Sequence, residues 1–436
     1  MQAIALEKFN DGDNIFITGP GGSGKSYIIK QIKENAEKSG KHIQVCAMTG
    51  CAAVLLQCKA KTLHSWAGFG RACGESKDIV KRVVKNKHKK KLWKAVDVLV
   101  IDEVSMMSKK LFDIIDNIGR ISRGKKDIPF GGIQVVLSGD FYQLPPIGEN
   151  MDSDSIAFCF ESENWDNCIP NVIELTTIYR QSDSSYKKIL NQLRVGKITP
   201  STIIALTGRV NIPISEDVIP TILYPTRNQS DTVNNKEYKK LTADKEYVFD
   251  LQIVDDMSDL KAEQKVARSN CCDEYVESEV TNLTSSVLVD KSLKLKVGTR
   301  VMCVANIDQE CDLPIVNGSQ GIVISFADNG SIPVVKFQNG SIRQIISHCW
   351  SSENVPGISI LQIPLIYSWA LTIHKSQGVT LDTAQIDAGS KIFECGQTYV
   401  ALSRVKDIKG LYLTSFNYKS IKVNKKAKDF YDKLII

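Results

Sequence analysis

The stretch NIFITGPGGSGKSYIIKQIKENAEKSG, residues 14–40, contains the three elements that decide the fold. Ile15–Thr18 is a short apolar run that predicts a buried strand. Gly19–Ser26, GPGGSGKS, fits the pattern GxxxxGK[ST]. Apolar residues at helical spacing from Tyr27 to Ile32 then predict a helix that ends near Gly40. A strand, a glycine-rich turn and a helix in this order predict a phosphate-binding loop.

The residue types of this loop suit a nucleotide triphosphate. Backbone N–H groups at a helix N-terminus point at phosphate oxygens, and glycines let the backbone approach them closely. Lys25 would reach the β- and γ-phosphates of ATP, and the Ser26 hydroxyl would hold Mg²⁺. A chance match to the pattern is expected in roughly one chain in a hundred of this size, and the correct strand–loop–helix context makes it rarer.

A second candidate strand ends in two carboxylates. VDVLVIDEVSMM contains the apolar run Val98–Ile101, followed by Asp102 and Glu103. A continuous apolar run suits a parallel strand covered on both faces, and ligands bind beyond the carboxyl ends of such strands. Asp102 would hold Mg²⁺, directly or through water, and Glu103 would orient and activate an attacking water. For the pattern alone, a pair of ordinary surface carboxylates is the alternative.

A third candidate strand lies in IQVVLSGDFYQLPP. Ile133–Leu137 is apolar, and Asp140 and Gln143 follow just past its end. Gln143 is a neutral donor and acceptor, so it could contact both the γ-phosphate and a lytic water. The alternative is a simple turn closed by Pro145 and Pro146.

Composition limits the class of protein. At ~100–200 residues per domain, 436 residues predict two to four units. The net charge of +6 permits a polyanionic partner without requiring one. Twelve cysteines without paired CxxC spacing favour reduced thiols in an intracellular compartment, nucleus or cytoplasm, and no structural metal. The start MQAIALEKFNDGDN does not read as a signal peptide, and no apolar run approaches ~20 residues, so we expect no membrane span.

The motifs GPGGSGKS, DEVSM and GDFYQLPP, in this order, resemble those of the superfamily 1B DNA helicases. The resemblance is strongest to the Pif family (petite integration frequency helicases), relatives of the RecD-like enzymes. It covers nearly the whole chain, because six further segments are similar to the family's DNA-contacting, arginine, signature and later motifs: TGCAAVLLQCKAKTLHSW, LTTIYRQSD, LNQLRVG, LYPTRNQSDTVN, WALTIHKSQGVTLD and YVALSRV. What it implies is an ATP-driven motor that moves on single-stranded DNA, 5′ to 3′ in this family.

The resemblance also implies a fold. We expect an α/β protein with two RecA-like P-loop domains, each a parallel sheet flanked by helices. A small wedge-like insertion is expected in the first domain and a small β-barrel in the second. The expected boundaries are residues 1–178 for the first domain, 64–96 for its insertion, 179–235 with 365–436 for the second domain, 236–364 for the inserted domain and about 294–346 for its barrel.

Sequence patterns in the inserted region support the barrel. Val297–Ala305, Gln320–Phe326 and Pro333–Phe337 read as short strands, and VNGSQGIV and VVKFQNG resemble the family's barrel. Asn-Gly pairs at 317–318, 329–330 and 339–340 supply the positive φ that tight hairpins need. The barrel either helps to hold DNA or is purely structural.

Two arginines far from the phosphate loop complete the expected nucleotide site. Hydrolysis spreads negative charge over the γ-phosphoryl oxygens, and a mobile arginine that neutralises it contributes ~10³–10⁵ in rate. By resemblance, Arg404 in YVALSRV and Arg180 in LTTIYRQSD supply this charge from the second domain, and Gln2 reads adenine. The alternative for each arginine is a salt-bridged surface residue. We expect catalysis from Lys25, Glu103, Gln143, Arg180 and Arg404. The expected nucleotide ligands are Gln2, Gly19, Gly21, Gly22, Ser23, Gly24, Lys25, Ser26, Tyr27, Asp102, Gln143, Arg180, Gly378 and Arg404, with Ser26 and Asp102 holding Mg²⁺.

The resemblance also implies DNA contacts. Motor contacts to single strands are mostly to the backbone, so sequence preference should be weak. The candidates are Thr49, His64, Thr372, His374 and Lys375. His64 could instead be a core histidine beside Trp66. Gln377 and Gly378 are expected to couple the DNA groove to the nucleotide. The run KNKHKKK, Lys85–Lys91, either tracks phosphates or is a solvated face.

Three functions remain open at this point. The first is an ATP-dependent DNA helicase, monomeric on DNA, whose partners are single-stranded DNA and forked or tailed duplexes. The second is an ATP-controlled DNA-binding clamp or translocase that does not unwind. The third is a P-loop kinase, which leaves TIHKSQG and SRV unexplained.

Overall fold

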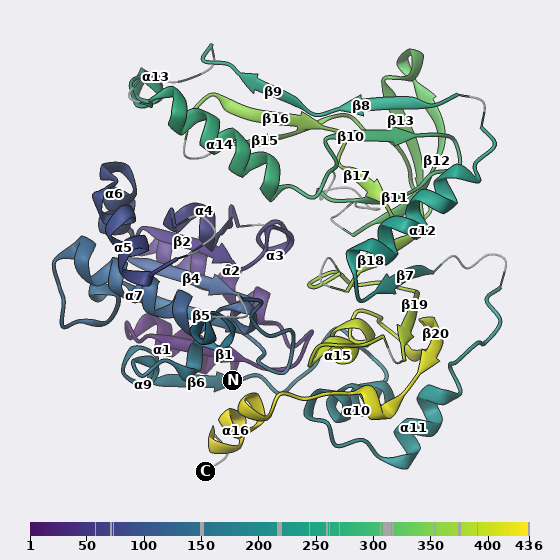
Figure 1. The fold of residues 1–436 in the computed structure, drawn as a ribbon, viewed down its shortest axis with the longest axis horizontal. Coiled ribbons are helices and arrows are strands. Elements are labelled where there is room, and N and C mark those ends of the chain that lie inside the picture. The colour runs from purple at the N-terminus through teal and green to yellow at the C-terminus, as the bar shows by residue number, and fades with distance from the viewer. Residues whose placement is uncertain are drawn as a thin grey trace. The chain divides into compact units, whose positions relative to one another are not determined.

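A computed structural model describes residues 1–56, 58–69, 72, 74–148, 152–215, 220–243, 245–258, 260, 262–269, 271–305, 307, 315, 318–352, 355–373, 376–389 and 391–434 (Figure 1). The chain divides into two compact units. Unit 1 comprises residues 1–220 and 376–436, and unit 2 comprises residues 221–375.

Unit 1 contains a six-stranded parallel sheet with the strand order β3-β2-β4-β5-β1-β6. The strands are β1 (Ile15–Thr18), β2 (Ile43–Ala47), β3 (Lys61–Thr62), β4 (Val98–Asp102), β5 (Gln134–Gly139) and β6 (Asn171–Glu174). The three strands predicted from apolar runs, β1, β4 and β5, are buried along their whole length and lie next to one another. Their carboxyl ends therefore share one edge of the sheet.

Unit 1 also contains a parallel strand pair, β19 (Ala384–Ala388) with β20 (Leu411–Phe416), and the helices that follow. The helices are α1 (Gln2–Asn10), α2 (Lys25–Lys38), α3 (Gly50–Leu55), α4 (Leu63–Ala67), α5 (Ser76–Lys85), α6 (Lys87–Ala95), α7 (Lys109–Arg123), α8 (Ser153–Ile156), α9 (Trp165–Cys168), α10 (Ser184–Val195), α11 (Pro200–Thr207), α15 (Gln397–Leu402) and α16 (Lys425–Leu434). The helix predicted after the phosphate loop is α2, which ends two residues before Gly40.

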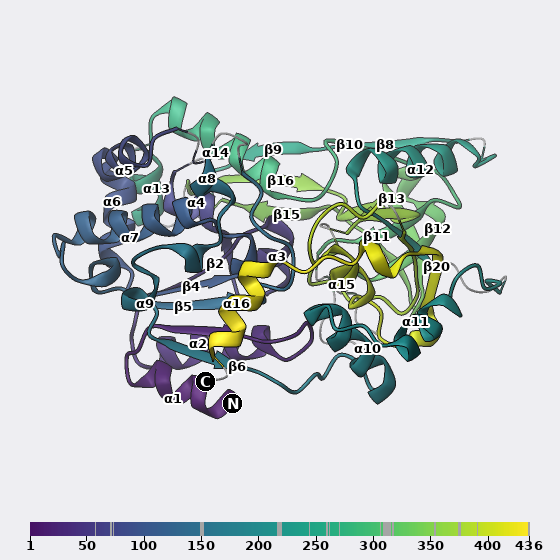
Figure 2. The same cartoon turned by 60° about the horizontal axis from the view of Figure 1, so that its bottom comes forward.

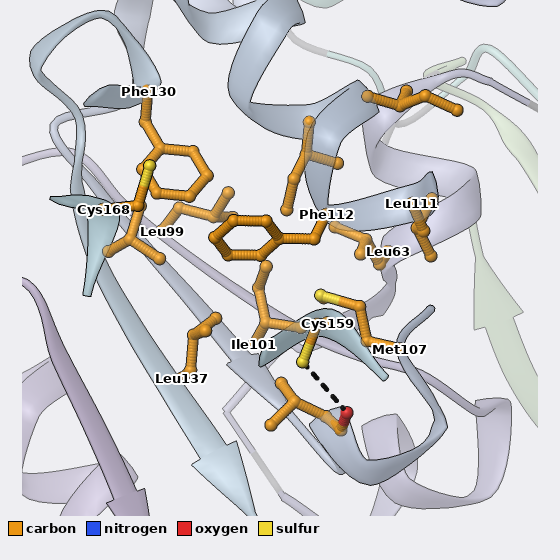
Figure 3. Close-up of a cluster of buried hydrophobic side chains, with 14 of the residues drawn as sticks. Leu63, Leu99, Ile101, Met107, Leu111, Phe112, Phe130, Leu137, Cys159 and Cys168 are labelled. Carbon is orange, nitrogen blue, oxygen red and sulfur yellow. Dashed lines mark hydrogen bonds between the residues drawn. The ribbon is translucent and has the colours of Figure 1, made fainter. Parts of the chain in front are cut away.

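Two hydrophobic cores cover the two faces of the six-stranded sheet. Alternate residues of a strand point to opposite faces. Leu99 and Ile101 of β4 accordingly belong to one core with Phe112 of α7, whereas Val98 and Val100 belong to the other core with apolar residues of α1 and α2. Figure 3 shows Phe112 surrounded by the side chains of the first core. A sheet with both faces packed needs the continuous apolar strands that the sequence contains.

Unit 2 is built mostly from antiparallel strands. A five-stranded sheet has the order β14-β13-β12-β11-β17, a three-stranded sheet has the order β15-β16-β9, and β10 pairs with β8. The elements are β7 (Thr221–Tyr224), α12 (Arg227–Lys239), β8 (Tyr247–Asp250), β9 (Gln252–Asp255), α13 (Ala262–Ser269), α14 (Asp273–Ser286), β10 (Ser292–Leu295), β11 (Arg300–Cys303), β12 (Gln320–Ala327), β13 (Ile332–Phe337), β14 (Ile342–Gln344), β15 (His348–Ser351), β16 (Ile358–Gln362), β17 (Leu365–Tyr367) and β18 (Ala370–Thr372). A parallel pair, β18 with β7, completes the unit.

The strands and two of the turns predicted for the inserted region are confirmed. β11, β12 and β13 lie inside or over the three predicted strand segments. Gly330 and Gly340 have φ of 104° and 88°, and they connect β12 to β13 and β13 to β14 as antiparallel pairs. The third predicted turn includes Asn317, which lies outside the described residues. Within the part of the chain that the structure describes, no helix is both long and apolar enough to span a membrane.

The burial of Phe112 gives a stability prediction. Phe112→Ala should lower the free energy of unfolding by about 3–5 kcal/mol, because it removes a fully buried ring and leaves a cavity. Urea unfolding followed by tryptophan fluorescence measures the loss, since the Trp165 ring lies 5.4 Å from the Phe112 ring. Ile121→Ala on the same helix is the matched control, because Ile121 is 42% exposed and should change stability by less than about 0.5 kcal/mol. Equal effects of the two substitutions would contradict this packing.

Candidate functional site

The phosphate loop joins β1 to α2, and the hydrogen-bonding groups of its side chains are partly satisfied within the loop itself. Gly24, the residue before α2, has a φ of 91°, a conformation that favours glycine. The Lys25 ammonium folds back and donates to the carbonyl oxygens of Gly19 (2.7 Å) and Pro20 (3.1 Å). The Ser23 hydroxyl is buried without a hydrogen-bond partner among the described residues. Burial lowers the pKa of Lys25, so the loop favours an anion that would compensate the buried charge.

Two carboxylates face this loop from the end of β4. Asp102 is the last residue of the strand, and Glu103 follows in a left-handed conformation with a φ of 58°. Such strain in a non-glycine residue is typical of functional sites. Burial raises the pKa of Asp102, and burial together with the Asp102 charge raises the pKa of Glu103 to about 7. The Gln377 amide donates a 2.9 Å hydrogen bond to Glu103, which fixes one carboxylate oxygen.

The loop after β5 carries Gln143 toward the same place. Its backbone N–H donates to the Asp140 carbonyl at 2.8 Å, so the tight turn considered above as an alternative is present. Gln143 also lines the cavity described below while being only 4% exposed. The turn is held by Arg194 of α10, which donates two hydrogen bonds to the buried Asp140 carboxylate at 2.9 Å.

The two predicted arginines lie against the phosphate loop within unit 1. Arg404 is 2% exposed, and it donates to the Val400 carbonyl and the Ser403 hydroxyl. A side chain at Gly21 would lie 3.4 Å from its guanidinium, and one at Gly22 would lie 2.5 Å from the Cβ of Arg180. These two glycines therefore allow both arginines to approach the loop.

Neither arginine is a salt-bridged surface residue. Among the described residues, no carboxylate lies within ion-pair distance of Arg180 or Arg404. Burial, and then the neighbouring Arg180, lower the pKa of Arg404 to about 9, and burial lowers the pKa of Arg180. The Glu103 charge acts on both guanidinium groups without forming an ion pair with either, so a bound anion would compensate the buried charge further.

These groups surround one cavity of about 320 Å³. It is lined by Gly21, Gly22, Ser23, Gly24, Lys25, Ser26, Ala52, Leu56, Asp102, Glu103, Gln143, Arg180, Gly378 and Arg404. The phosphate loop, both carboxylates, Gln143 and both arginines were predicted from separate parts of the sequence, and the structure brings them together.

Three predicted nucleotide ligands do not line this cavity. The Gly19 carbonyl accepts from Lys25, and Tyr27 is 56% exposed with its hydroxyl bonded to Gln31. The Gln2 amide lies 2.8 Å from the position that a Gly24 side chain would take, beside the loop.

The sequence reasoning missed three residues at the site. Ala52 and Leu56 line the cavity from α3 and the residue after it. The Tyr399 hydroxyl accepts a 2.8 Å hydrogen bond from the Gly21 N–H. Tyr399 lies five residues before Arg404, so its closeness in sequence to a predicted site arginine could have pointed to it.

The donor set fits a magnesium ion. The Ser26 hydroxyl and the Asp102 carboxylate line the same cavity, and Mg²⁺ prefers oxygen ligands of these kinds. A cation there would offset the repulsion between Asp102 and Glu103. Ser26 and Asp102 would therefore hold the ion beside the phosphates.

Three of the five predicted DNA contacts, Thr49, His64 and Thr372, lie among the described residues. Thr49 caps α3, because its hydroxyl accepts from the Ala52 N–H at 3.2 Å. The His64 ring packs edge-on against Phe69 at 5.1 Å, and burial lowers its pKa, so it has features of the core histidine alternative. Thr372 lines a cavity of about 230 Å³ in unit 2 together with residues of α12. His374 and Lys375 lie outside the described residues.

The lysine run is not uniform. Lys85, Lys87 and Lys91 are exposed at the end of α5 and along α6. Lys89 is instead 7% exposed, and its ammonium donates to the carbonyl oxygens of Ser65 and Trp66. Lys89 thus holds α6 against α4, and only its neighbours can meet a phosphate backbone.

Comparison with known proteins places these features in a family. Residues 2–202 match the family "PIF1-like helicase", and residues 280–326 match "DNA helicase Pif1, 2B domain". The chain is 32% identical to the ATP-dependent DNA helicase PIF1 of Xenopus laevis over 99% of its own length, but it spans only 64% of that protein. It is also 32% identical to protein 030L of Invertebrate iridescent virus 6, with 99% and 93% of the two chains covered.

Solved structures confirm the expected fold class of two RecA-like domains with two insertions. The Pif1 helicase of Candida albicans aligns with a TM-score of 0.76 at 32% identity over 99% of this chain and 98% of that one. The Pif1 of Bacteroides sp in complex with ADP-AlF4 aligns with a TM-score of 0.76 at 28% identity over 100% and 96%. The chain therefore belongs to the PIF1-like helicase family.

Proposed function

We propose that this chain is an ATP-dependent DNA helicase that hydrolyses ATP to move along single-stranded DNA and to separate duplexes. The observation that carries the proposal is the single cavity in which the phosphate loop, Glu103 and two buried arginines meet. A triphosphate is the anion that fits this combination of lysine, carboxylates and guanidinium groups. The chain's similarity to ATP-dependent DNA helicases along 99% of its length supports the same activity.

The proposed chemistry assigns one task to each group. The phosphate loop and Lys25 bind the β- and γ-phosphates, and bound Mg²⁺ would neutralise part of their charge. Glu103 orients the attacking water and accepts its proton, and Gln143 contacts the γ-phosphate. Arg180 and Arg404 then stabilise the charge that develops on the transferred phosphoryl group.

The segment that contains Gln377 would link bound DNA to the ATP site. The candidates Thr372, His374 and Lys375 come shortly before it in the sequence, and its amide donates a hydrogen bond to the Glu103 carboxylate. A DNA strand bound to these residues would shift the position of Gln377. Gln377 would in turn shift Glu103, the proposed general base. The Bacteroides Pif1 has been solved bound to ssDNA, and forked dsDNA unwinding by two coordinating Pif1 helicases has been described.

The proposed function includes domain bounds, a direction of movement, a number of copies and a metal. The first RecA-like domain is residues 1–178, and residues 179–235 with 365–436 form the second, around an inserted domain at 236–364. Movement is 5′ to 3′, and one copy acts on the DNA. Mg²⁺ is the metal.

Arg404 is the sharpest test of the ATP site. Arg404→Ala should retain ATP binding but lower the DNA-stimulated hydrolysis rate on the order of 10³-fold, because the fork of donors to the transferred phosphoryl group is lost. A fluorescent ATP analogue measures binding, and phosphate release measures turnover. Arg404→Lys keeps the charge without the planar fork and should recover only part of the rate. Near-normal turnover of Arg404→Ala would refute the role.

Unwinding and its direction need a separate test. A forked duplex with a 5′ single-stranded tail should be separated in the presence of ATP and Mg²⁺, whereas the same duplex with only a 3′ tail should not. A strand-displacement assay followed by gel or fluorescence gives the result. Displacement on neither substrate, with ATP hydrolysis still stimulated by single strands, would favour the clamp. Absence of that stimulation would favour the kinase.

The lysine run outside Lys89 predicts the salt dependence of DNA binding, since Lys85, Lys87 and Lys91 are exposed and Lys90 is half-buried. Four neutralising substitutions to glutamine at Lys85, Lys87, Lys90 and Lys91 should reduce the slope of log affinity against log salt, by ~0.7 for each lysine that contacts a phosphate of a single strand. The matched control neutralises four exposed lysines elsewhere in unit 1: Lys38, Lys125, Lys126 and Lys197. Equal slopes for the two variants would show that the run is only a solvated face.

A further inference from the structure

The C-terminal helix α16 contributes a buried tyrosine to the edge of the sheet from which the ATP site is built. Figure 2 shows the chain leaving β20 and returning to the six-stranded sheet, where α16 ends the described residues. Ala427 and Tyr431 are the buried residues of this helix, and Tyr431 is 4% exposed. Most other side chains of α16 are exposed, so the helix is anchored mainly by one face.

The Tyr431 hydroxyl joins the ends of two strands. It lies 2.5 Å from the Thr18 hydroxyl and accepts a 3.1 Å hydrogen bond from the Phe141 N–H. Thr18 is the last residue of β1, directly before the phosphate loop. Phe141 lies in the turn after β5 that ends in Gln143. One hydroxyl therefore links the start of the phosphate loop to the turn that carries the γ-phosphate contact.

The ring of Tyr431 strengthens the same link. It stacks on the Tyr142 ring with centroids 4.7 Å apart, and the Arg194 guanidinium lies 5.3 Å from its centroid. Arg194 in turn holds the Asp140 carboxylate. Tyr431 thus contacts Phe141 and Tyr142 of the 140–143 turn directly, and it lies next to the Arg194 side chain that holds Asp140.

The segment that leads into α16 is hydrogen-bonded to the start of α15, the helix that ends two residues before Arg404. The Gly396 N–H, at the start of α15, donates to the Lys422 carbonyl at 3.1 Å. The same α15 supplies Tyr399, whose hydroxyl contacts Gly21 of the phosphate loop. The C-terminal segment therefore contacts both the helix that leads to Arg404 and the loops that meet the triphosphate.

From this arrangement we infer that Tyr431 is a positioning residue for ATP hydrolysis. Its hydroxyl sets the phosphate loop and the Gln143 turn in one fixed relation, and α16 thereby makes turnover depend on the C-terminal segment. Tyr431 touches no substrate, so it acts through Thr18 and Phe141. The inference rests on the proposed ATP hydrolysis but adds a residue that none of the motifs contains.

A double-mutant cycle tests the inference. Tyr431→Phe keeps the ring and removes the hydroxyl, and Thr18→Val removes the partner hydroxyl at nearly constant volume. Each should lower kcat for DNA-stimulated hydrolysis about three- to tenfold, the effect of breaking the hydrogen-bonded link between Thr18 and Phe141, while KM for ATP changes little. Tyr431→Phe also leaves the Phe141 N–H without this partner, so it should lower the thermal midpoint as well as kcat. Because both remove the same link, the double variant should be no slower than the slower single variant.

Controls separate the possible outcomes. Tyr238→Phe removes another buried hydroxyl, which bonds to Glu246 in unit 2, and it should leave kcat unchanged. Losses of kcat that multiply in the double variant, or an unchanged kcat in Tyr431→Phe, would overturn the inference. So would a lower thermal midpoint with normal kcat, which would show a packing role alone. A wild-type chain without DNA-stimulated hydrolysis would instead refute the proposed function.

Discussion

Buried positive charge that nearby carboxylates compensate only in part is the constraint on which this structure depends: Glu103 acts on Lys25, Arg180 and Arg404 without an ion pair to any of them among the described residues. Arg180 and Arg404 lie beside the phosphate loop, and among the described residues Lys25 donates hydrogen bonds to the loop's own carbonyls. Burying such groups is costly unless an anion compensates them. Under the proposed function, a bound triphosphate supplies the missing negative charge.

The rest of unit 1 serves to hold these charges at one edge of a parallel sheet. Neighbouring strands β1, β4 and β5 end together, so the phosphate loop, the Asp102–Glu103 pair and the Gln143 turn converge without long loops. Packing on both faces of the sheet fixes those ends. Segments that follow much later in the chain, α15 and α16, then reach back to the same edge through Tyr399, Arg404 and Tyr431.

Sequence reasoning recovered what has a local pattern. Apolar runs predicted β1, β4 and β5, and Asn-Gly pairs predicted the hairpins around β13. Both predictions succeed because a buried strand requires neighbouring apolar residues and a positive φ favours glycine. Tyr431 has no such local pattern, since an isolated tyrosine in an amphipathic helix reads as ordinary core, whereas Tyr399 stands in the segment YVALSRV but no pattern there gives its contact with Gly21. Lys89 was misjudged for a related reason: a lysine inside a charged run looks solvated until its ammonium is found on the carbonyls of α4. The arginines came from the family resemblance and not from periodicity.

In the proposed function, both arginines contact the terminal phosphate in the transition state. A crystal structure of this chain with ADP, aluminium fluoride, Mg²⁺ and single-stranded DNA measures this most directly. The account predicts that the guanidinium groups of Arg180 and Arg404 both donate hydrogen bonds to the fluoride atoms that mimic the transferred phosphoryl group. Guanidinium groups turned away from the fluoride, with another cation in their place, would contradict it.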